Sequence, residues 1–113
     1  MRRVLIVEDD ADISELLTMM VRDAGGEPLT VFSGDDAVAA AQDVALALVD
    51  LSVPRLKGAA LLDALSTRVR ELVVVSAARD AEIVASAHKV RACFVKPFDV
   101  RALQRVLREI LAA

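Results

Sequence analysis

The chain has 113 residues, of which 56% are hydrophobic, 27% charged and 3% aromatic, and its formal net charge is −3. A chain of this length has room for one hydrophobic core, so we expect residues 1–113 to form a single domain. The acidic balance and the scarcity of aromatic side chains argue against direct binding to nucleic acid, and apolar runs of about five residues are too short to cross a membrane.

The first half of the chain alternates between strand and helix patterns. Residues 3–7 form an apolar, β-branched run that predicts a strand, and apolar residues then recur at helical spacing until Gly25-Gly26. Residues 27–32 predict a second strand, and Ser33 is a candidate N-cap for an alanine-rich helix that ends near Gln42. Residues 44–49 are apolar throughout, as expected for a strand covered on both faces, and Asp50 follows directly.

The same unit repeats in the second half. We expect helices over about 59–68, 80–89 and 100–111, and strands over 72–76 and 92–95. Five strands that alternate with five helices through short connections, without a hairpin signal, predict a parallel five-stranded sheet with helices on both faces. This is the doubly wound, flavodoxin-like α/β fold.

Polar side chains follow four of the five predicted strands. They are Glu8, Asp9, Asp10, Asp50, Ser76 and Lys96. Open α/β sheets bind ligands beyond the carboxyl ends of their strands, so we expect these side chains to lie close together. Clustered carboxylates favour a bound cation, and an all-oxygen ligand set favours Mg²⁺, with Mn²⁺ able to substitute. Together with Lys96 and the Ser76 hydroxyl, such a cation suits a phosphoryl group, for which Asp50 would be the nucleophile.

Four sequence blocks resemble the receiver domain of two-component response regulators and extend over nearly the whole chain. The blocks are Val-Leu-Ile-Val-Glu-Asp-Asp at 4–10, Leu-Val-Asp-Leu-Ser-Val-Pro at 48–54 with Gly58 beyond it, Val-Val-Ser-Ala at 74–77 and Phe-Val-Lys-Pro-Phe at 94–98. The resemblance implies that Asp50 is the phosphorylation site. It also implies that the Asp9 and Asp50 side chains bind Mg²⁺ directly and that Glu8 acts through a metal-bound water.

The resemblance assigns roles to three further residues. The backbone carbonyl of Ser52 would complete the protein ligands of the metal, the Ser76 hydroxyl would contact the phosphoryl group, and Lys96 would pair with it. The Lys96-Pro97 peptide is expected to be cis. Asp10 lies outside the usual acidic pair and is interpreted as a residue that initiates the following helix.

Partners and location follow from the same resemblance. The phosphoryl donor would be a histidine kinase or a histidine phosphotransfer protein, and a downstream protein or a second copy would bind the face around the last two helices. The domain would catalyse its own phosphorylation and dephosphorylation without being an enzyme for a separate substrate. Cys93 is the only cysteine, which excludes an internal disulfide and fits a reducing cytoplasm. The resemblance implies that this cytoplasm is bacterial.

Some positions depart from the family pattern. Cys93 stands three residues before Lys96, where receiver domains usually carry an aromatic switch residue, so Ser76 and Cys93 form the predicted switch pair. The spacings between Asp50, Ser76 and Lys96 are short, which predicts that the third and fourth helices or their loops are trimmed. Ser52 and Ala78 offer no carboxylate or carboxamide to orient an attacking water, which predicts slow self-dephosphorylation.

Alternative interpretations stay open at this point. Cys93 favours a degenerate receiver that works constitutively as an interaction module. A metal-dependent phosphohydrolase would need a second aspartate close after the nucleophile, whereas Leu51-Ser52 follows Asp50. His88 is interpreted as a surface residue without a partner. The arginines on one side of the last helix, at positions 101, 105 and 108, form either a solvated face or a partner surface.

Overall fold

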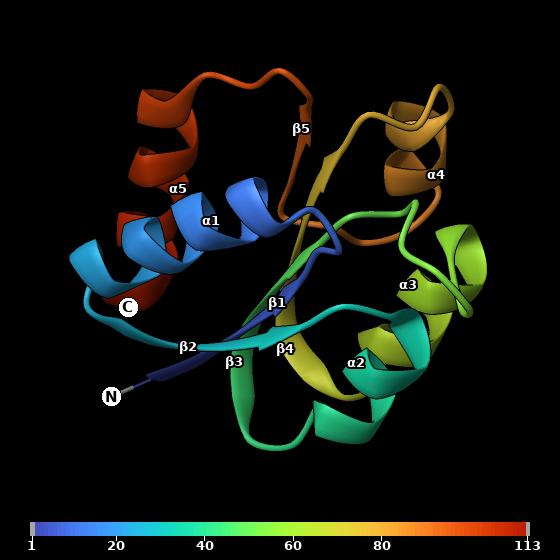
Figure 1. Ribbon diagram of the computed structural model, residues 1–113, viewed down its shortest axis with the longest axis horizontal. Coiled ribbons are helices and arrows are strands. Elements are labelled where there is room, and N and C mark those ends of the chain that lie inside the picture. Colours follow the sequence, from blue (N-terminus) through green and yellow to red (C-terminus); the bar gives the residue numbers. More distant parts are fainter. Residues whose placement is uncertain (1, 113) are drawn as a thin grey trace.

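A computed structural model describes residues 2–112 as ten elements in strict strand–helix alternation (Figure 1). The strands are β1 (Arg2–Val7), β2 (Gly26–Val31), β3 (Val44–Val49), β4 (Val69–Ser76) and β5 (Ala92–Val95). The helices are α1 (Ala11–Asp23), α2 (Gly34–Ala40), α3 (Gly58–Ser66), α4 (Ala81–Ser86) and α5 (Val100–Ala112). None of the helices within residues 2–112 has the length and apolarity needed to span a bilayer.

The five strands form one parallel sheet in the order β2-β1-β3-β4-β5. Strand β3 lies at the centre, where Leu46 pairs with Val4 of β1 on one side and with Glu71 of β4 on the other. All six residues of β3 are buried, as the unbroken apolar run predicted. The predicted flavodoxin-like, doubly wound fold is therefore confirmed.

Side chains that alternate along the strands supply two separate cores, one on each face of the sheet. One core joins Leu5, Val49 and Val74 to the buried residues of α2, α3 and α4. The other joins Ile6 and Leu48 to the buried residues of α1 and α5. Figure 1 shows this division, with α1 and α5 on one side of the sheet and the other three helices opposite. Each fully buried leucine contributes roughly 1.5–3 kcal/mol of hydrophobic stabilisation, so both cores fix the strand positions firmly.

Local hydrogen bonds explain where the helices after β1 and β2 begin. The Asp10 side chain accepts from the backbone amides of Asp12 and Ile13, which makes Asp10 the N-cap of α1. Ser33 caps α2 in the same way by accepting from the Asp36 amide. Both caps were predicted, and Asp10 is thereby occupied at the helix terminus.

Two boundaries differ from the sequence prediction by three residues, the start of the fourth strand and the end of the fourth helix. Strand β4 begins at Val69, three residues earlier than expected, because Val69 and Glu71 pair with Val44 and Leu46 of β3. Helix α4 ends at Ser86, whose hydroxyl donates to the Ile83 carbonyl. With nine residues in α3 and six in α4, the third and fourth helices are short, as the motif spacing predicted.

Candidate functional site

The carboxyl ends of four strands bring the predicted site residues to one edge of the sheet. Backbone hydrogen bonds continue the sheet pattern just past the strand ends, from Asp50 N–H to the Val7 carbonyl at 2.9 Å and from Lys96 N–H to the Ser76 carbonyl at 3.0 Å. Glu8 N–H donates to the Val31 carbonyl at 3.1 Å in the same way. The side chains of the site are therefore placed by the sheet itself.

Asp50 is the centre of this arrangement and is only 6% exposed. Its Oδ1 accepts a hydrogen bond of 2.9 Å from the Ser76 hydroxyl and another of 2.9 Å from the Ser52 amide. Its Oδ2 accepts from Lys96 Nζ at 3.1 Å. These three donors hold the carboxylate in one orientation, with both of its oxygens bound by groups that favour negative charge.

Lys96 joins Asp50 to a second buried carboxylate. Its Nζ lies 2.6 Å from Oε1 of Glu8, a residue that is 1% exposed. Burial raises the pKa of Glu8, and the hydrogen bonds from Lys96 and the Asp10 amide offset this only in part. Burial alone would lower the pKa of Lys96, but its hydrogen bonds to Glu8 and Asp50 outweigh that effect and raise it. Lys96 is therefore a fixed positive charge at this edge, and its peptide bond to Pro97 is cis, as expected.

Three carboxylates of this edge are close enough to share a cation. Glu8, Asp9 and Asp50 each offer an oxygen, and these oxygens lie within 4.8 Å of one another. Asp9 is exposed, whereas the other two are buried, so the cluster opens to solvent on one side. An open, all-oxygen set of this kind fits a hard divalent ion that keeps several waters.

Comparisons with known proteins agree with this geometry. Residues 4–108 match the sequence model of the response regulator receiver domain. The chain belongs to this family. It is thus a receiver domain of the kind found in two-component response regulators, a family of signalling domains.

Individual relatives of this receiver domain are known from sequence and from structure. Over 59 residues it is 34% identical to the DNA-binding response regulator MtrA of Mycobacterium tuberculosis, which covers 50% of this chain and 26% of MtrA. The chain thus matches about a quarter of the length of that curated relative. A sensor protein from Polaromonas sp. JS666 is 33% identical, with a TM-score of 0.82 over 98% of this chain and 96% of its own.

A further solved structure shares the fold at lower identity. It is the receiver domain of the sensor histidine kinase PA1611 from Pseudomonas aeruginosa PAO1, with a magnesium ion coordinated in its active-site cleft. That domain is 22% identical to this chain, with a TM-score of 0.83, and the match covers 99% of this chain and 98% of the other.

Cys93 of this receiver domain lies in β5 and is half-buried. It packs against the core that contains the buried residues of α4. Burial raises the pKa of the Cys93 thiol, and the Glu82 carboxylate adds to the effect. The thiolate is thus disfavoured, which supports the packing interpretation over a redox role.

His88 was predicted to be an exposed residue without a partner, and this was wrong. Its side chain is only 15% exposed. Nδ1 lies 2.8 Å from the Val84 carbonyl and Nε2 lies 2.8 Å from Oδ1 of Asp63 in α3. The residues that the sequence placed on the exposed side of α5, Arg101 and Arg105 among them, are exposed as predicted.

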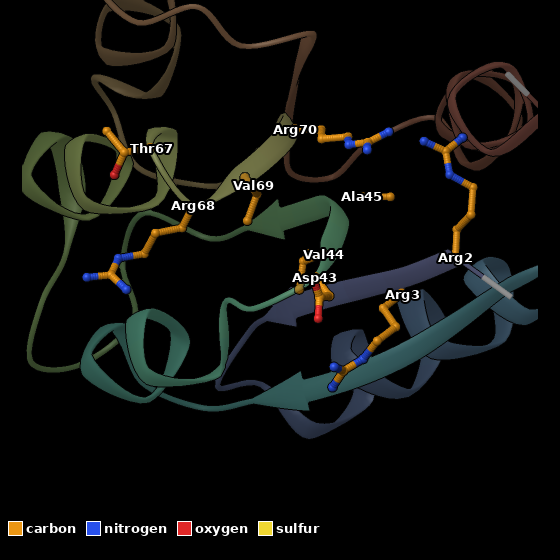
Figure 2. Close-up of a pocket in the computed structure, with 9 residues that line it drawn as sticks. All are labelled: Arg2, Arg3, Asp43, Val44, Ala45, Thr67, Arg68, Val69 and Arg70. Atoms are coloured by element: carbon orange, nitrogen blue, oxygen red, sulfur yellow. The ribbon is translucent and has the colours of Figure 1, made fainter.

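A hollow of about 670 Å³ opens at the opposite, amino edge of the sheet (Figure 2). Arginines 2, 3, 68 and 70 line it together with Asp43 and the start of β3. In Figure 2 the guanidinium groups of Arg2 and Arg70 point toward one another, whereas Arg68 extends to the far side of the hollow. Because the four cationic groups do not converge on one point, this hollow lacks the geometry of the site around Asp50.

Proposed function

We propose that this receiver domain accepts a phosphoryl group on Asp50 from the phosphohistidine of a histidine kinase or a histidine phosphotransfer protein. The observation that carries the proposal is the environment of Asp50, a buried carboxylate bound by Ser76, Ser52 and Lys96. Asp50 belongs to a carboxylate cluster that opens to solvent beside Asp9. In the transfer, a carboxylate oxygen of Asp50 forms a bond to phosphorus while the phosphorus–nitrogen bond of the donor breaks. The product is an acyl phosphate. The electrons of the broken bond stay on the donor nitrogen, and the donor imidazole leaves neutral because its other ring nitrogen carries a proton before the transfer.

Each neighbour of Asp50 then has a definite task. Lys96 is held as a cation by two carboxylates, and it would pair with an oxygen of the incoming phosphoryl group. The Ser76 hydroxyl is fully buried and already points at Asp50, so it can donate to another phosphoryl oxygen. Movement of Ser76 toward the new charge, together with the residues around Cys93, would switch the conformation of the domain.

The carboxylate cluster supports a requirement for Mg²⁺, with Mn²⁺ as a substitute. The side chains of Asp9 and Asp50 and the backbone carbonyl of Ser52 would hold the ion directly, and Glu8 would act through a water. When bound, a divalent ion neutralises negative charge on the phosphoryl oxygens. The magnesium ion in the PA1611 receiver domain, which has the same fold, supports this assignment.

Two exposed apolar surfaces suit the protein partners. A cleft of about 380 Å³ beside Lys96 is lined by Ile13, Leu16 and Phe98, and a phosphoryl donor that docks there would reach Asp50. Around α4, β5 and α5, Ile83 is 73% exposed and Val95 is 42% exposed. We assign this second face to a downstream protein or a second copy, and we place the domain in the bacterial cytoplasm.

The proposal is tested by weighing the protein after incubation with Mg²⁺ and phosphoramidate or acetyl phosphate. A gain of one phosphoryl group is expected in the wild type and should be absent from Asp50→Ala and in the presence of EDTA. Asp63→Ala is a matched control, because it removes a carboxylate outside the site. Absence of the adduct in the wild type would overturn the proposal.

Cys93 favours one alternative function. A degenerate receiver would bind its partner constitutively, since the residue at the usual aromatic position cannot report phosphorylation. That reading predicts equal partner binding by the wild type and by Asp50→Ala. Binding that increases on phosphorylation contradicts it.

A further inference from the structure

The first residue of α2 packs closely against the loop that follows Asp50. Gly34 N–H donates to the Pro54 carbonyl at 3.1 Å. A Cβ atom built on Gly34 would lie 1.7 Å from the Leu56 carbonyl oxygen and 2.6 Å from its carbon, which are rigid backbone atoms. Real Cβ contacts are never this short, so only glycine fits while the loop keeps its present position.

Gly34 is required for steric reasons, whereas two other glycines are favoured by their backbone conformation. Gly25 and Gly58 have φ angles of +90° and +60°, where glycine is favoured by backbone conformation, and a Cβ on either would meet nothing within 4 Å. Gly34 has no such backbone requirement. The absence of its side chain lets the start of α2 touch the loop.

The loop over residues 51–58 is closed and carries contacts of the candidate site. Gly58 N–H donates to the Leu51 carbonyl at 3.0 Å, and the side chains of Leu51 and Val53 are buried. Between them, Ser52 donates its amide to Asp50 Oδ1 at 2.9 Å. A shift of this loop would therefore move Ser52 relative to Asp50.

We propose that Gly34 is a positioning residue for the phosphoacceptor site. It contacts no reacting atom, but it determines how closely the 51–58 loop packs against α2. The packing of this loop in turn determines the positions of the Ser52 amide and carbonyl relative to Asp50. The consequence for phosphorylation rests on the proposed function of Asp50. An added methyl group at Gly34 has to displace the Leu56 carbonyl, and displacements of about 1 Å can cost on the order of 100-fold in rate at a reacting centre.

The test compares Gly34→Ala with Gly25→Ala in the full chain. Gly25→Ala is the matched control, because it strains the backbone after α1 without touching the loop. With phosphoramidate as donor, Gly34→Ala should be phosphorylated roughly tenfold or more slowly and should need more Mg²⁺ for half-maximal rate. Gly25→Ala should keep the wild-type rate and Mg²⁺ dependence even where it unfolds at lower urea. A folded Gly34→Ala protein with wild-type kinetics would overturn the inference.

A second variant decides the case if Gly34→Ala does not fold. Pro54→Gly keeps the carbonyl that Gly34 contacts and alters an exposed side chain, but it frees the loop backbone. It should slow phosphorylation and raise the Mg²⁺ requirement in the same way, and unchanged kinetics would count against the role of Gly34.

Hydrogen exchange of the Ser52 amide separates this inference from the function of Asp50. If the wild type accepts no phosphoryl group, the proposed function is wrong. The packing of the 51–58 loop against α2 can still be measured in that case, through the protection of the Ser52 amide from exchange. Protection of the Ser52 amide should fall in Gly34→Ala, or in Pro54→Gly if that variant alone folds, and should persist in Gly25→Ala. Equal protection of the Ser52 amide in the wild type and in Gly34→Ala, or in Pro54→Gly where that variant alone folds, would show that Gly34 does not position the loop.

Discussion

The ammonium of Lys96 lies 2.6 Å from Oε1 of Glu8, although 88 positions separate the two residues in the chain. The Glu8 side chain is 1% exposed and that of Lys96 is 16% exposed. Because little water reaches either group, each charge is stabilised mainly by the ion pair and less by hydration. Breaking a buried pair by removing one partner is costly because the remaining charge is left uncompensated.

Lys96→Met should therefore destabilise the fold by about 3 kcal/mol at neutral pH. Burial already raises the pKa of Glu8 above its ordinary value of 4.5, and loss of the ammonium should raise it further. A group whose pKa is raised in the folded state loses its stabilising contribution as the pH rises through that folded-state pKa. The stability that Lys96→Met loses relative to the wild type should therefore grow above pH 4.5 and shrink below it. Urea unfolding across this range measures the effect. Lys89→Met, at an exposed lysine, should show no such trend.

The two hydrogen bonds of His88, to Val84 in α4 and to Asp63 in α3, should stabilise the fold in a pH-dependent way. Hydrogen bonds to the Val84 carbonyl and the Asp63 carboxylate raise the pKa of His88 above its ordinary value of 6.5. The stabilisation is then fully present below pH 6.5 and is lost as the pH rises through the folded-state pKa. The melting temperature of His88→Gln should accordingly fall short of the wild type by more at pH 6 than at pH 9. An equal shortfall at both pH values would show that the ring acts through packing alone.

Magnesium should stabilise the folded chain through the carboxylate cluster. At a Mg²⁺ concentration tenfold above the dissociation constant, linkage adds about 1.4 kcal/mol. For a domain of this size that corresponds to a rise of roughly 5 °C in melting temperature. Asp9→Asn should abolish most of the rise, whereas Asp12→Asn, which removes an exposed charge in the first turn of α1, should retain it. The same rise in both variants would place the ion elsewhere.

The acyl phosphate on Asp50 should decay slowly. Ser52 is exposed and Ala78 is half-buried beside the site, and neither side chain can orient a water for attack on phosphorus as a carboxylate or carboxamide can. Following the intact mass after removal of the phosphoryl donor measures the lifetime. Ser52→Asn should shorten it, with Ser66→Asn as an exposed control in α3. Loss of the phosphoryl group from the wild type within seconds contradicts this expectation.

The site edge was predictable because its placement depends on patterns that are local in sequence. Apolar runs define the strands, and in a parallel sheet the residue after each run falls at a known edge, which was enough to bring Asp50, Ser76 and Lys96 together. The two helix caps at Asp10 and Ser33 are equally local, since each depends on residues two or three positions away.

Other features depend on contacts that no local pattern encodes. His88 and Asp63 are 25 residues apart, and only the packing of α3 beside the turn after α4 makes them partners. The early start of β4 was missed because Arg70 and Glu71 interrupt the apolar run, although their backbone continues the ladder. Gly34 carries no sequence signal for its role, because the close approach of the Leu56 carbonyl is set by tertiary packing.

The two edges of the sheet differ in charge balance, with four arginines and Asp43 around the amino-edge hollow and three carboxylates beside Lys96 at the carboxyl edge. From this distribution we expect the domain to have an electric dipole along its strands, despite its small net charge of −3. A protein with a basic surface is turned by this field as it approaches, so that the edge carrying Asp50 meets it first. Such steering accelerates encounter without strengthening the final complex, and it weakens as ionic strength rises.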